Sequence, residues 1–296
     1  MASAELQTVV QMLRSQPPIQ GDDIHSMRAA MESLMGAIPP PEDAKLEPVD
    51  AGGVPAEWTT ANGADSGRVV VYFHGGGYTL GSIATHRPLV ARLSRAAGAR
   101  VISVDYRLAP EHPCPAAIED AVAAYRHVVA GGVAPSRIAI AGDSAGGGLT
   151  AACLVALRDA GDPLPAAGVC ISPWLDLSLS SGSWQTRAAD DPLVQRREIQ
   201  MMADAYLAGA DPKTATASPL FADLAGLPPI LVQVGTAEVL LDDANGFAER
   251  ARAAGVDVEL DVWEDMIHVW HAFADLLPEA RDAIDRIAAF LAARLD

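Results

Sequence analysis

A serine stands between two glycines where a short apolar run meets a helix-forming segment. The run Ile138–Ala141 is typical of a buried strand, Gly142-Asp143-Ser144-Ala145-Gly146 follows it, and alanines and leucines continue to about residue 160. A strand-to-helix turn that presents a serine crowds the backbone two residues before and two residues after it, where glycine fits best. The pattern predicts a strand, a sharp turn and a helix with Ser144 at the tip, where a neighbouring base could make it a nucleophile. The alternative is a glycine-rich turn without chemistry.

A second glycine-rich segment, His-Gly-Gly-Gly at residues 74–77, follows another strand-like run. Acyl transfer builds negative charge on a carbonyl oxygen, and backbone N–H groups held about 2.7–3.1 Å away stabilise that charge. Glycines let the backbone approach this closely. We expect N–H donors at Gly76, Gly77 and Ala145, and we expect His74 to hold the loop by hydrogen bonds. A mobile loop tip or a phosphate cradle is the alternative, although no Lys-Ser/Thr pair follows the glycines.

The base must come from a histidine after Ser144, because strand–turn–helix hydrolases of this kind run in the order serine, acid, histidine. Only His268 and His271 follow Ser144. His268 lies in a loop after the strand-like run Val256–Val262, as expected of a base carried off the end of a strand. We predict that His268 is the base and that His271 lies on a helix surface or packs within the fold.

The acid should follow the preceding strand-like run, Ile230–Val234. Glu238 stands in the turn just beyond it, where a carboxylate can reach the histidine Nδ1. Asp242 and Asp243 come at the start of the next helical pattern, where acidic side chains complement unpaired N–H groups. We predict Glu238 as the acid, with Asp242 as the alternative.

These motifs together resemble the bacterial hormone-sensitive-lipase-like esterases, also called family IV, of the α/β-hydrolases. The resemblance runs from about residue 54 to residue 293. It is carried by the following segments: residues 74–77, Asp105–Pro113 (DYRLAPEHP), Gly142–Gly147 and Leu227–Pro229. One departure is that relatives with an aspartate before the nucleophile commonly use an aspartate as the acid, whereas the aligned position here is Glu238. Related plant hormone receptors keep the fold but lose the histidine, so a binding protein without turnover is an alternative function.

The Asp105–Pro113 segment is interpreted as a brace for the glycine loop and the serine turn. Its prolines stiffen the chain, and Arg107 could pair with a buried carboxylate such as Asp143.

Strand-like and helical patterns alternate along most of the chain. We predict strands near 46–50, 54–60, 69–73, 100–105, 137–141, 166–171, 230–234 and 256–262, and helices near 86–97, 116–130, 145–160, 241–254 and 278–293. Such alternation predicts an α/β fold: one mostly parallel, eight-stranded sheet with helices on both faces and functional loops at the carboxyl ends of the strands. Residues 1–296 form a single α/β-hydrolase domain in this interpretation.

Two segments fall outside the alternation, at about 1–42 and 183–212, and we interpret both as a helical cap over the site. The first has apolar residues at helical spacing: Leu6, Val9, Val10 and Leu13, then Ile24, Met27, Met31, Leu34 and Met35. The second contains Met201, Met202, Tyr206 and Leu207. A methionine stripe fits either plain core or the lining of a pocket that accepts varied acyl groups.

The net charge of −17 disfavours nucleic acid and anionic membranes as partners. No stretch of about 18 apolar residues is free of charge. The three cysteines, Cys114, Cys153 and Cys170, are odd in number and lack metal-ligand spacing, which suits a reducing compartment. We expect a cytoplasmic protein without a metal or organic cofactor.

The combined interpretation is a serine carboxylesterase that hydrolyses small, short-acyl esters through an acyl-enzyme, with Ser144, Glu238 and His268 as the catalytic residues. A lactonase or amidase on the same scaffold is a further alternative.

The resemblance also suggests a homodimer joined through the last strand. The acidic residues Asp257, Glu259 and Asp261 alternate along that strand, however, and would crowd together in a two-fold pairing.

Overall fold

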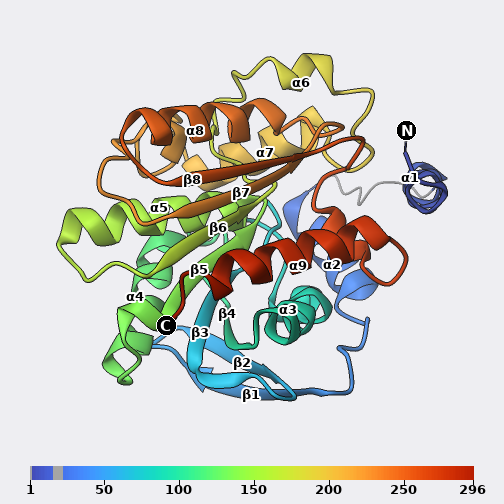
Figure 1. Cartoon of the computed structure of the whole chain (residues 1–296). Coiled ribbons are helices and arrows are strands. Elements are labelled where there is room, and N and C mark those ends of the chain that lie inside the picture. Colours follow the sequence, from blue (N-terminus) through green and yellow to red (C-terminus); the bar gives the residue numbers. More distant parts are fainter. Residues whose placement is uncertain (1, 16–22) are drawn as a thin grey trace.

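A mostly parallel sheet runs through the molecule. The computed structural model describes residues 2–15 and 23–296, and within these residues eight strands pair in the order β1-β2-β4-β3-β5-β6-β7-β8. The β1–β2 and β2–β4 pairs are antiparallel, and the other five pairs are parallel. The strands are β1 (Ala44–Asp50), β2 (Pro55–Ala61), β3 (Asp65–Phe73), β4 (Ala99–Val104), β5 (Ile138–Asp143), β6 (Ala167–Ile171), β7 (Ile230–Gly235) and β8 (Val258–Trp263). Figure 1 shows the sheet twisting from β1 at one edge to β8 at the other.

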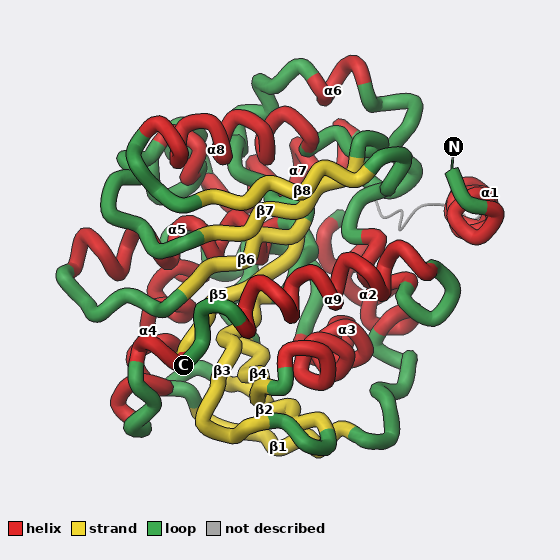
Figure 2. Tube along the Cα trace, in the orientation of Figure 1, coloured by secondary structure: helices red, strands yellow, loops and turns green. Residues whose placement is uncertain are grey.

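Helices cover both faces of this sheet, as the alternating pattern predicts. They are α3 (Ile83–Ala97), α4 (Ala116–Ala130), α5 (Ala145–Ala160), α8 (Leu241–Ala253) and α9 (Pro278–Ala292). Alternate residues of β3 point to opposite faces: Val69, Val71 and Phe73 pack in one apolar cluster with α4, α5 and α8, whereas Val70 and Tyr72 pack in the other with α3 and α9. Figure 2 shows α3 and α9 side by side on one face of the strands. The predicted fold class is confirmed.

The helix boundaries agree with the prediction except at the start of α3, which begins at Ile83 rather than near residue 86. Ser82 and Thr85 form a capping box there: the Ser82 side chain accepts a hydrogen bond from the Thr85 N–H, and the Thr85 hydroxyl accepts one from the Ser82 N–H. Apolar periodicity alone does not reveal such a polar first turn.

The two segments outside the alternation contain α1 (Ala4–Ser15) and α2 (Ile24–Met35), then α6 (Ser183–Thr186) and α7 (Arg196–Leu207). Figure 1 shows α1 and α6 at the periphery, outside the layers of the sheet. The Arg14 side chain donates hydrogen bonds to the carbonyls of Ala189 and Asp190, which joins α1 to the second segment. Residues 1 and 16–22 of the first segment lie outside the described residues.

The apolar stripes of these helices are buried in part. Leu6 and Val9 pack with α9, whereas Ile24, Met27 and Met31 pack in the cluster on the other face. Leu34 is 56% exposed, whereas its neighbour Met35 packs against the cluster that contains Met31.

Candidate active site

Ser144 occupies a strained turn between β5 and α5. Its backbone has φ 54° and ψ −119°, a conformation that costs a non-glycine residue roughly 1–3 kcal/mol. A Cβ atom on Gly142 would lie 2.3 Å from the carbonyl oxygen of Gly146, and one on Gly146 would lie 2.0 Å from that of Phe73. The two glycines are therefore sterically required, as the sequence pattern predicts.

The serine turn is tied to the end of β6. The Ser144 N–H donates to the Ile171 carbonyl at 2.8 Å, and the Ser144 carbonyl accepts from the Trp174 N–H at 2.9 Å. Ser144 itself is 8% exposed and stands at the amino end of α5, where the helix dipole favours negative charge. The nucleophile position is thus nearly enclosed.

The structure brings Glu238 and His268 together. Glu238 Oε2 lies 2.9 Å from His268 Nδ1, and Glu238 Oε1 accepts from the Gly235 N–H at 2.7 Å and from the Ser172 hydroxyl at 2.8 Å. The Glu238 side chain is fully buried. Among the described residues, no hydrogen bond engages the Ser144 hydroxyl or His268 Nε2, so both atoms, which are the expected reacting atoms, remain available.

Burial and pairing act on this acid and base in different ways. Burial raises the pKa of Glu238 above its ordinary value, against the stabilising hydrogen bonds that it accepts. Burial alone would lower the pKa of His268, but the hydrogen bond and charge of Glu238 outweigh it, so that pKa is raised. The imidazole is consequently a better proton acceptor than a free histidine.

The two aspartates after Glu238 do not reach His268. Asp242 accepts from the Ser183 N–H at 2.7 Å, and Asp243 accepts from the N–H groups of Leu175 and Asp176. Both stand in the first turn of α8, as predicted. Their side chains nevertheless bond to the chain between β6 and α6 rather than to their own helix, and burial raises the pKa of Asp243 to about 7.

His271 packs in the interior, one of the two outcomes that the sequence leaves open. It is fully buried, and its Nε2 lies 2.8 Å from Gln233 Oε1. Burial lowers the pKa of His271 to about 3, so it stays neutral near pH 7.

The glycine loop leaves two backbone N–H groups unused, and the first residue of α5 leaves a third. Gly76 and Gly77 have φ of +116° and +61°, a region that glycine adopts readily. Within the described part of the chain, no hydrogen bond uses the N–H of Gly76, Gly77 or Ala145. A Cβ on Gly77 would lie 2.2 Å from the sulfur of Met202, so helix α7 packs directly on this loop.

His74 holds the loop, as the sequence predicts. Its Nδ1 donates to the Gly75 carbonyl at 2.7 Å, and its ring stacks on Tyr106 with ring centres 4.4 Å apart. The Tyr106 hydroxyl donates to the His74 carbonyl at 2.8 Å. These contacts place the tyrosine of the Asp105–Pro113 segment behind the glycine loop, in agreement with its interpretation as a brace.

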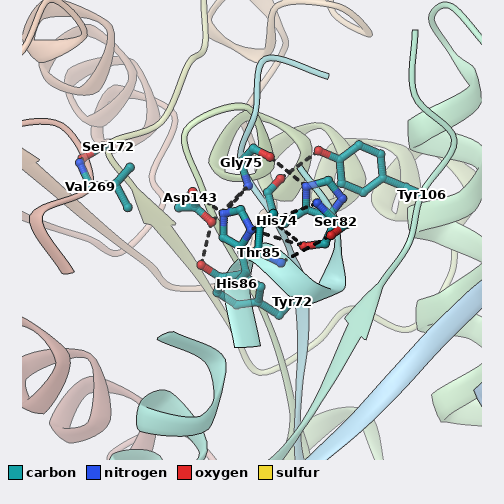
Figure 3. Close-up of polar contacts among 10 residues, drawn as sticks. All are labelled: Tyr72, His74, Gly75, Ser82, Thr85, His86, Tyr106, Asp143, Ser172 and Val269. Atoms are coloured by element: carbon teal, nitrogen blue, oxygen red, sulfur yellow. Dashed lines mark hydrogen bonds and ion pairs between the residues drawn. The ribbon is translucent and has the colours of Figure 1, made fainter. Parts of the chain in front are cut away.

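Asp143 is the centre of a buried network under the same loop (Figure 3). Its carboxylate accepts from the Tyr72 hydroxyl at 2.7 Å and from the Gly75 N–H at 3.1 Å, and it lies 3.3 Å from His86 Nε2. Burial opposes the charge on each partner, but the pairing outweighs it: the pKa of Asp143 is lowered and that of His86 is raised. The carboxylate thus fixes the first peptide of the glycine loop.

Arg107 pairs with a buried carboxylate, as expected, but that carboxylate is Asp120 of α4 and not Asp143. Arg107 also binds Glu119, and its side chain is 42% exposed. Asp143 lies under the glycine loop, where α3 supplies His86 as its partner. Sequence reasoning assigned no role to His86, because nothing in the order of motifs indicates that α3 passes beneath this loop.

Asp191 is another residue that the sequence analysis missed. It is 2% exposed, and its carboxylate accepts from the N–H groups of Leu193 and Val194 and, at 3.1 Å, from the N–H of Val239. Val239 directly follows Glu238, so this contact joins the 183–212 segment to the acid turn. An Asp-Pro pair before a helix signals only a turn, which is why the sequence did not reveal the contact.

Residues 2–15 and 23–296 contain no cluster of three or more histidine, cysteine, aspartate or glutamate residues that could hold a metal ion. No helix within these residues has the length and apolar character needed to span a bilayer.

Comparison with known proteins places the chain in a family. A family model described as the alpha/beta hydrolase fold matches residues 70–272. An acetyl-hydrolase of Streptomyces hygroscopicus is 46% identical, over 98% of this chain and 97% of that protein. A crystal structure of an esterase from the bacterial hormone-sensitive lipase family superimposes with a TM-score of 0.96 at 50% identity, covering 100% of both chains. The esterase EstE5, in a crystal soaked with p-nitrophenyl butyrate, gives a TM-score of 0.96 at 47% identity over 99% of both chains. This chain therefore belongs to the α/β-hydrolases, within the hormone-sensitive-lipase-like family of esterases.

Proposed function

We propose that the protein is a serine carboxylesterase that hydrolyses small, short-acyl esters through an acyl-enzyme. The observation that carries the proposal is the buried hydrogen bond between Glu238 and His268, which lies at the same edge of the sheet as the strained turn of Ser144. The unused N–H groups of Gly76, Gly77 and Ala145 are of the kind that stabilise the oxyanion formed in acyl transfer. The acetyl-hydrolase and esterase relatives support the same reaction class.

Each residue has a defined step in this mechanism. Ser144 Oγ attacks the ester carbonyl while His268 Nε2 takes its proton, and the N–H groups of Gly76, Gly77 and Ala145 hold the oxyanion. His268 then gives the proton to the leaving alcohol. Water, deprotonated by the same imidazole, attacks the acyl-enzyme, and the imidazolium returns that proton to Ser144 Oγ as the bond between Oγ and the acyl group breaks and the acid is released. Glu238 stays ionised throughout and keeps the proton on Nδ1.

Covalent labelling tests this assignment. A sulfonyl fluoride should add once per chain, because only an activated serine reacts readily. We expect intact mass to show one adduct, peptide mapping to place it on Ser144, and Ser144→Ala to lose both the adduct and the turnover of p-nitrophenyl butyrate. Turnover that persists in Ser144→Ala would overturn the proposal, and no turnover in the wild type would favour the receptor-like alternative. Comparable rates on matched amides would point to an amidase.

We also propose that the segments at about 1–42 and 183–212 form a cap that limits the acyl chain. Helix α7 supports this role, since Met202 packs on Gly77, one of the expected oxyanion donors. The hydrogen bonds of Arg14 to Ala189 and Asp190 support a cap whose two parts act together.

Met202→Ala should widen the range of substrates. Removing the side chain next to Gly77 opens space for a longer acyl group, and one methylene in an apolar pocket changes kcat/KM by about tenfold or more. We therefore expect the ratio of kcat/KM for p-nitrophenyl hexanoate to that for the acetate to rise by that order. Met201→Ala, at the half-buried neighbouring position, is the control and should leave the ratio unchanged. An unchanged ratio in Met202→Ala would contradict the pocket role.

A homodimer through β8 is a further proposal. β8 is an edge strand, and its acidic residues are compensated within the chain: Arg286 pairs with Glu259 and Asp261, and Arg294 pairs with Asp257 and Glu259. These pairs reduce the repulsion that the alternating acids would cause across a two-fold axis. Light scattering at several salt concentrations should give twice the chain mass, with little dependence on salt. A monomer at high protein concentration would end this proposal.

A cytoplasmic location is proposed from the thiols. Cys114, Cys153 and Cys170 are all free, as expected in a reducing compartment.

A further inference from the structure

Ser172, the residue after β6, bridges the acid and the histidine loop. It is fully buried, and its Oγ lies 2.8 Å from Glu238 Oε1 and 3.1 Å from the backbone nitrogen of Val269. Val269 directly follows His268. A single hydroxyl therefore contacts Glu238 and the residue next to His268, on loops that lie 30 residues apart in sequence.

The chemistry of the two neighbours fixes the direction of both hydrogen bonds. An ionised carboxylate can only accept, and a backbone N–H can only donate. The Ser172 hydroxyl must therefore donate a hydrogen bond to Glu238 and accept one from the Val269 N–H. No other rotation of the hydroxyl satisfies both buried neighbours.

Both ends of the Ser172–Val269 contact are conformationally strained. Ser172 has φ +43°, and Val269 has φ +48° and ψ +46°. The left-handed region is particularly unfavourable for a β-branched residue such as valine, and strain of this kind persists only where the surroundings impose it. Figure 3 shows Ser172 and Val269 meeting from separate segments of the chain. The hydroxyl is thus a contact that holds Val269 in an unfavourable backbone conformation, and Val269 is the residue next to His268.

We propose that Ser172 is a positioning residue for the esterase reaction: its hydroxyl sets the place of the His268 loop and stabilises the negative charge of Glu238. The proposal rests on the function proposed above. It assigns Ser172 no contact with substrate, since it acts only through Glu238 and the backbone next to His268.

The proposal predicts a specific change in pH dependence. Losing a donor destabilises the state in which Glu238 is ionised and His268 is neutral, because that state carries an uncompensated buried charge. The Glu238–His268 pair should then take up the proton that inactivates the base at a higher pH than in the wild type. The other charged groups that act on His268 are Asp191, from the 183–212 segment, and Asp143, at the end of β5, and both remain in place. We expect the acid limb of kcat/KM to move to higher pH by about 0.5–1 unit, the equivalent of one hydrogen bond.

The test measures kcat, KM and the pH profile of kcat/KM for Ser172→Ala with p-nitrophenyl butyrate. We expect kcat to fall about tenfold or more with KM nearly unchanged, because misplacing the base affects the transition state rather than binding. Ser172→Gly is the second variant, since glycine adopts φ +43° without strain and should fold even where alanine does not. It should show the same loss and the same shift.

Ser94→Ala is the matched control. Ser94 is also fully buried, and its hydroxyl donates to the Ala99 carbonyl at 2.7 Å and accepts from the Ala61 N–H at 3.0 Å, on α3 and away from the catalytic loops. It should lower thermal stability without moving the acid limb. If the folded Ser172 variants keep the wild-type kcat and acid limb while Ser144→Ala is inactive, Ser172 is only structural and the positioning role is overturned. If Ser144→Ala is itself active, the proposed esterase mechanism is overturned, whatever the Ser172 variants show.

Discussion

Glu238→Gln should lower kcat by about 10⁴, the loss measured for the equivalent acid-to-amide change in a serine protease. An amide nitrogen facing His268 Nδ1 would favour the wrong tautomer, and a neutral side chain could not stabilise the imidazolium. The acid limb of kcat/KM should also move to lower pH. Glu238 raises the pKa of His268 against its burial, and removing that charge leaves the burial effect. This shift is opposite to the one expected for Ser172→Ala.

Asp242→Asn is the control for this experiment. Asp242 bonds to the Ser183 N–H and not to His268, so its amide should cost on the order of 1 kcal/mol of stability and little activity. Stopped-flow and steady-state rates should be compared on protein whose circular dichroism and melting temperature show it folded. The assignment of the acid is wrong if kcat collapses in Asp242→Asn and survives in Glu238→Gln.

Among the substitutions proposed here, Asp143→Ala should cause the largest loss of thermal stability. It would leave the His86 ring, the Tyr72 hydroxyl and the Gly75 N–H without their buried acceptor. Breaking a buried pair by removing one partner costs about 3–5 kcal/mol, and for a chain of this size each kcal/mol lowers Tm by about 2–4 °C. Calorimetry should therefore show Tm lower by roughly 6–20 °C. Asp159→Ala, which removes the exposed partner of Arg158, should change Tm by no more than a few degrees.

The pH dependence of this difference follows from the two shifted groups. The lowered pKa of Asp143 gives stability that is present above its ordinary value of 3.8 and is lost as pH falls through the folded value. The raised pKa of His86 gives stability that is present below its ordinary value of 6.5 and is lost as pH rises through the folded value. The difference in unfolding free energy between wild type and Asp143→Ala should therefore be widest between the two ordinary values, 3.8 and 6.5. A gap that is the same at every pH would show that packing, and not the ion pair, stabilises this network.

The sequence predicted the parts of the molecule that local patterns encode. Most of the buried strands have continuous apolar runs, and β8 alternates apolar and acidic residues. Ser144, Glu238 and His268 each lie within five residues of the end of a strand, so their placement at one edge of the sheet followed from parallel topology. Gly142 and Gly146 were predictable for a related reason, since their steric requirement is local to the turn.

The missed contacts are those that depend on long-range geometry. Ser172 and Val269 are 97 residues apart, and Asp191 and Val239 are 48 apart. A serine after a strand and an aspartate before a proline are ordinary residues in ordinary places. Only the three-dimensional arrangement of the loops shows that their polar atoms meet at the catalytic pair. The same reason explains why His86 had no assigned partner, since Asp143 is 57 residues away from it.

The parallel sheet leaves one rim of the molecule available for attachment to a solid support. All the expected catalytic groups lie at the carboxyl ends of the strands, whereas α4, α5 and α8 lead back to the amino ends through the exposed glycines Gly132, Gly161 and Gly255. A side chain added at any of these glycines would meet nothing within 4 Å, although their positive φ makes insertion of a flexible linker preferable to substitution. A tether placed at these turns would orient the immobilised enzyme with its catalytic edge toward the solution.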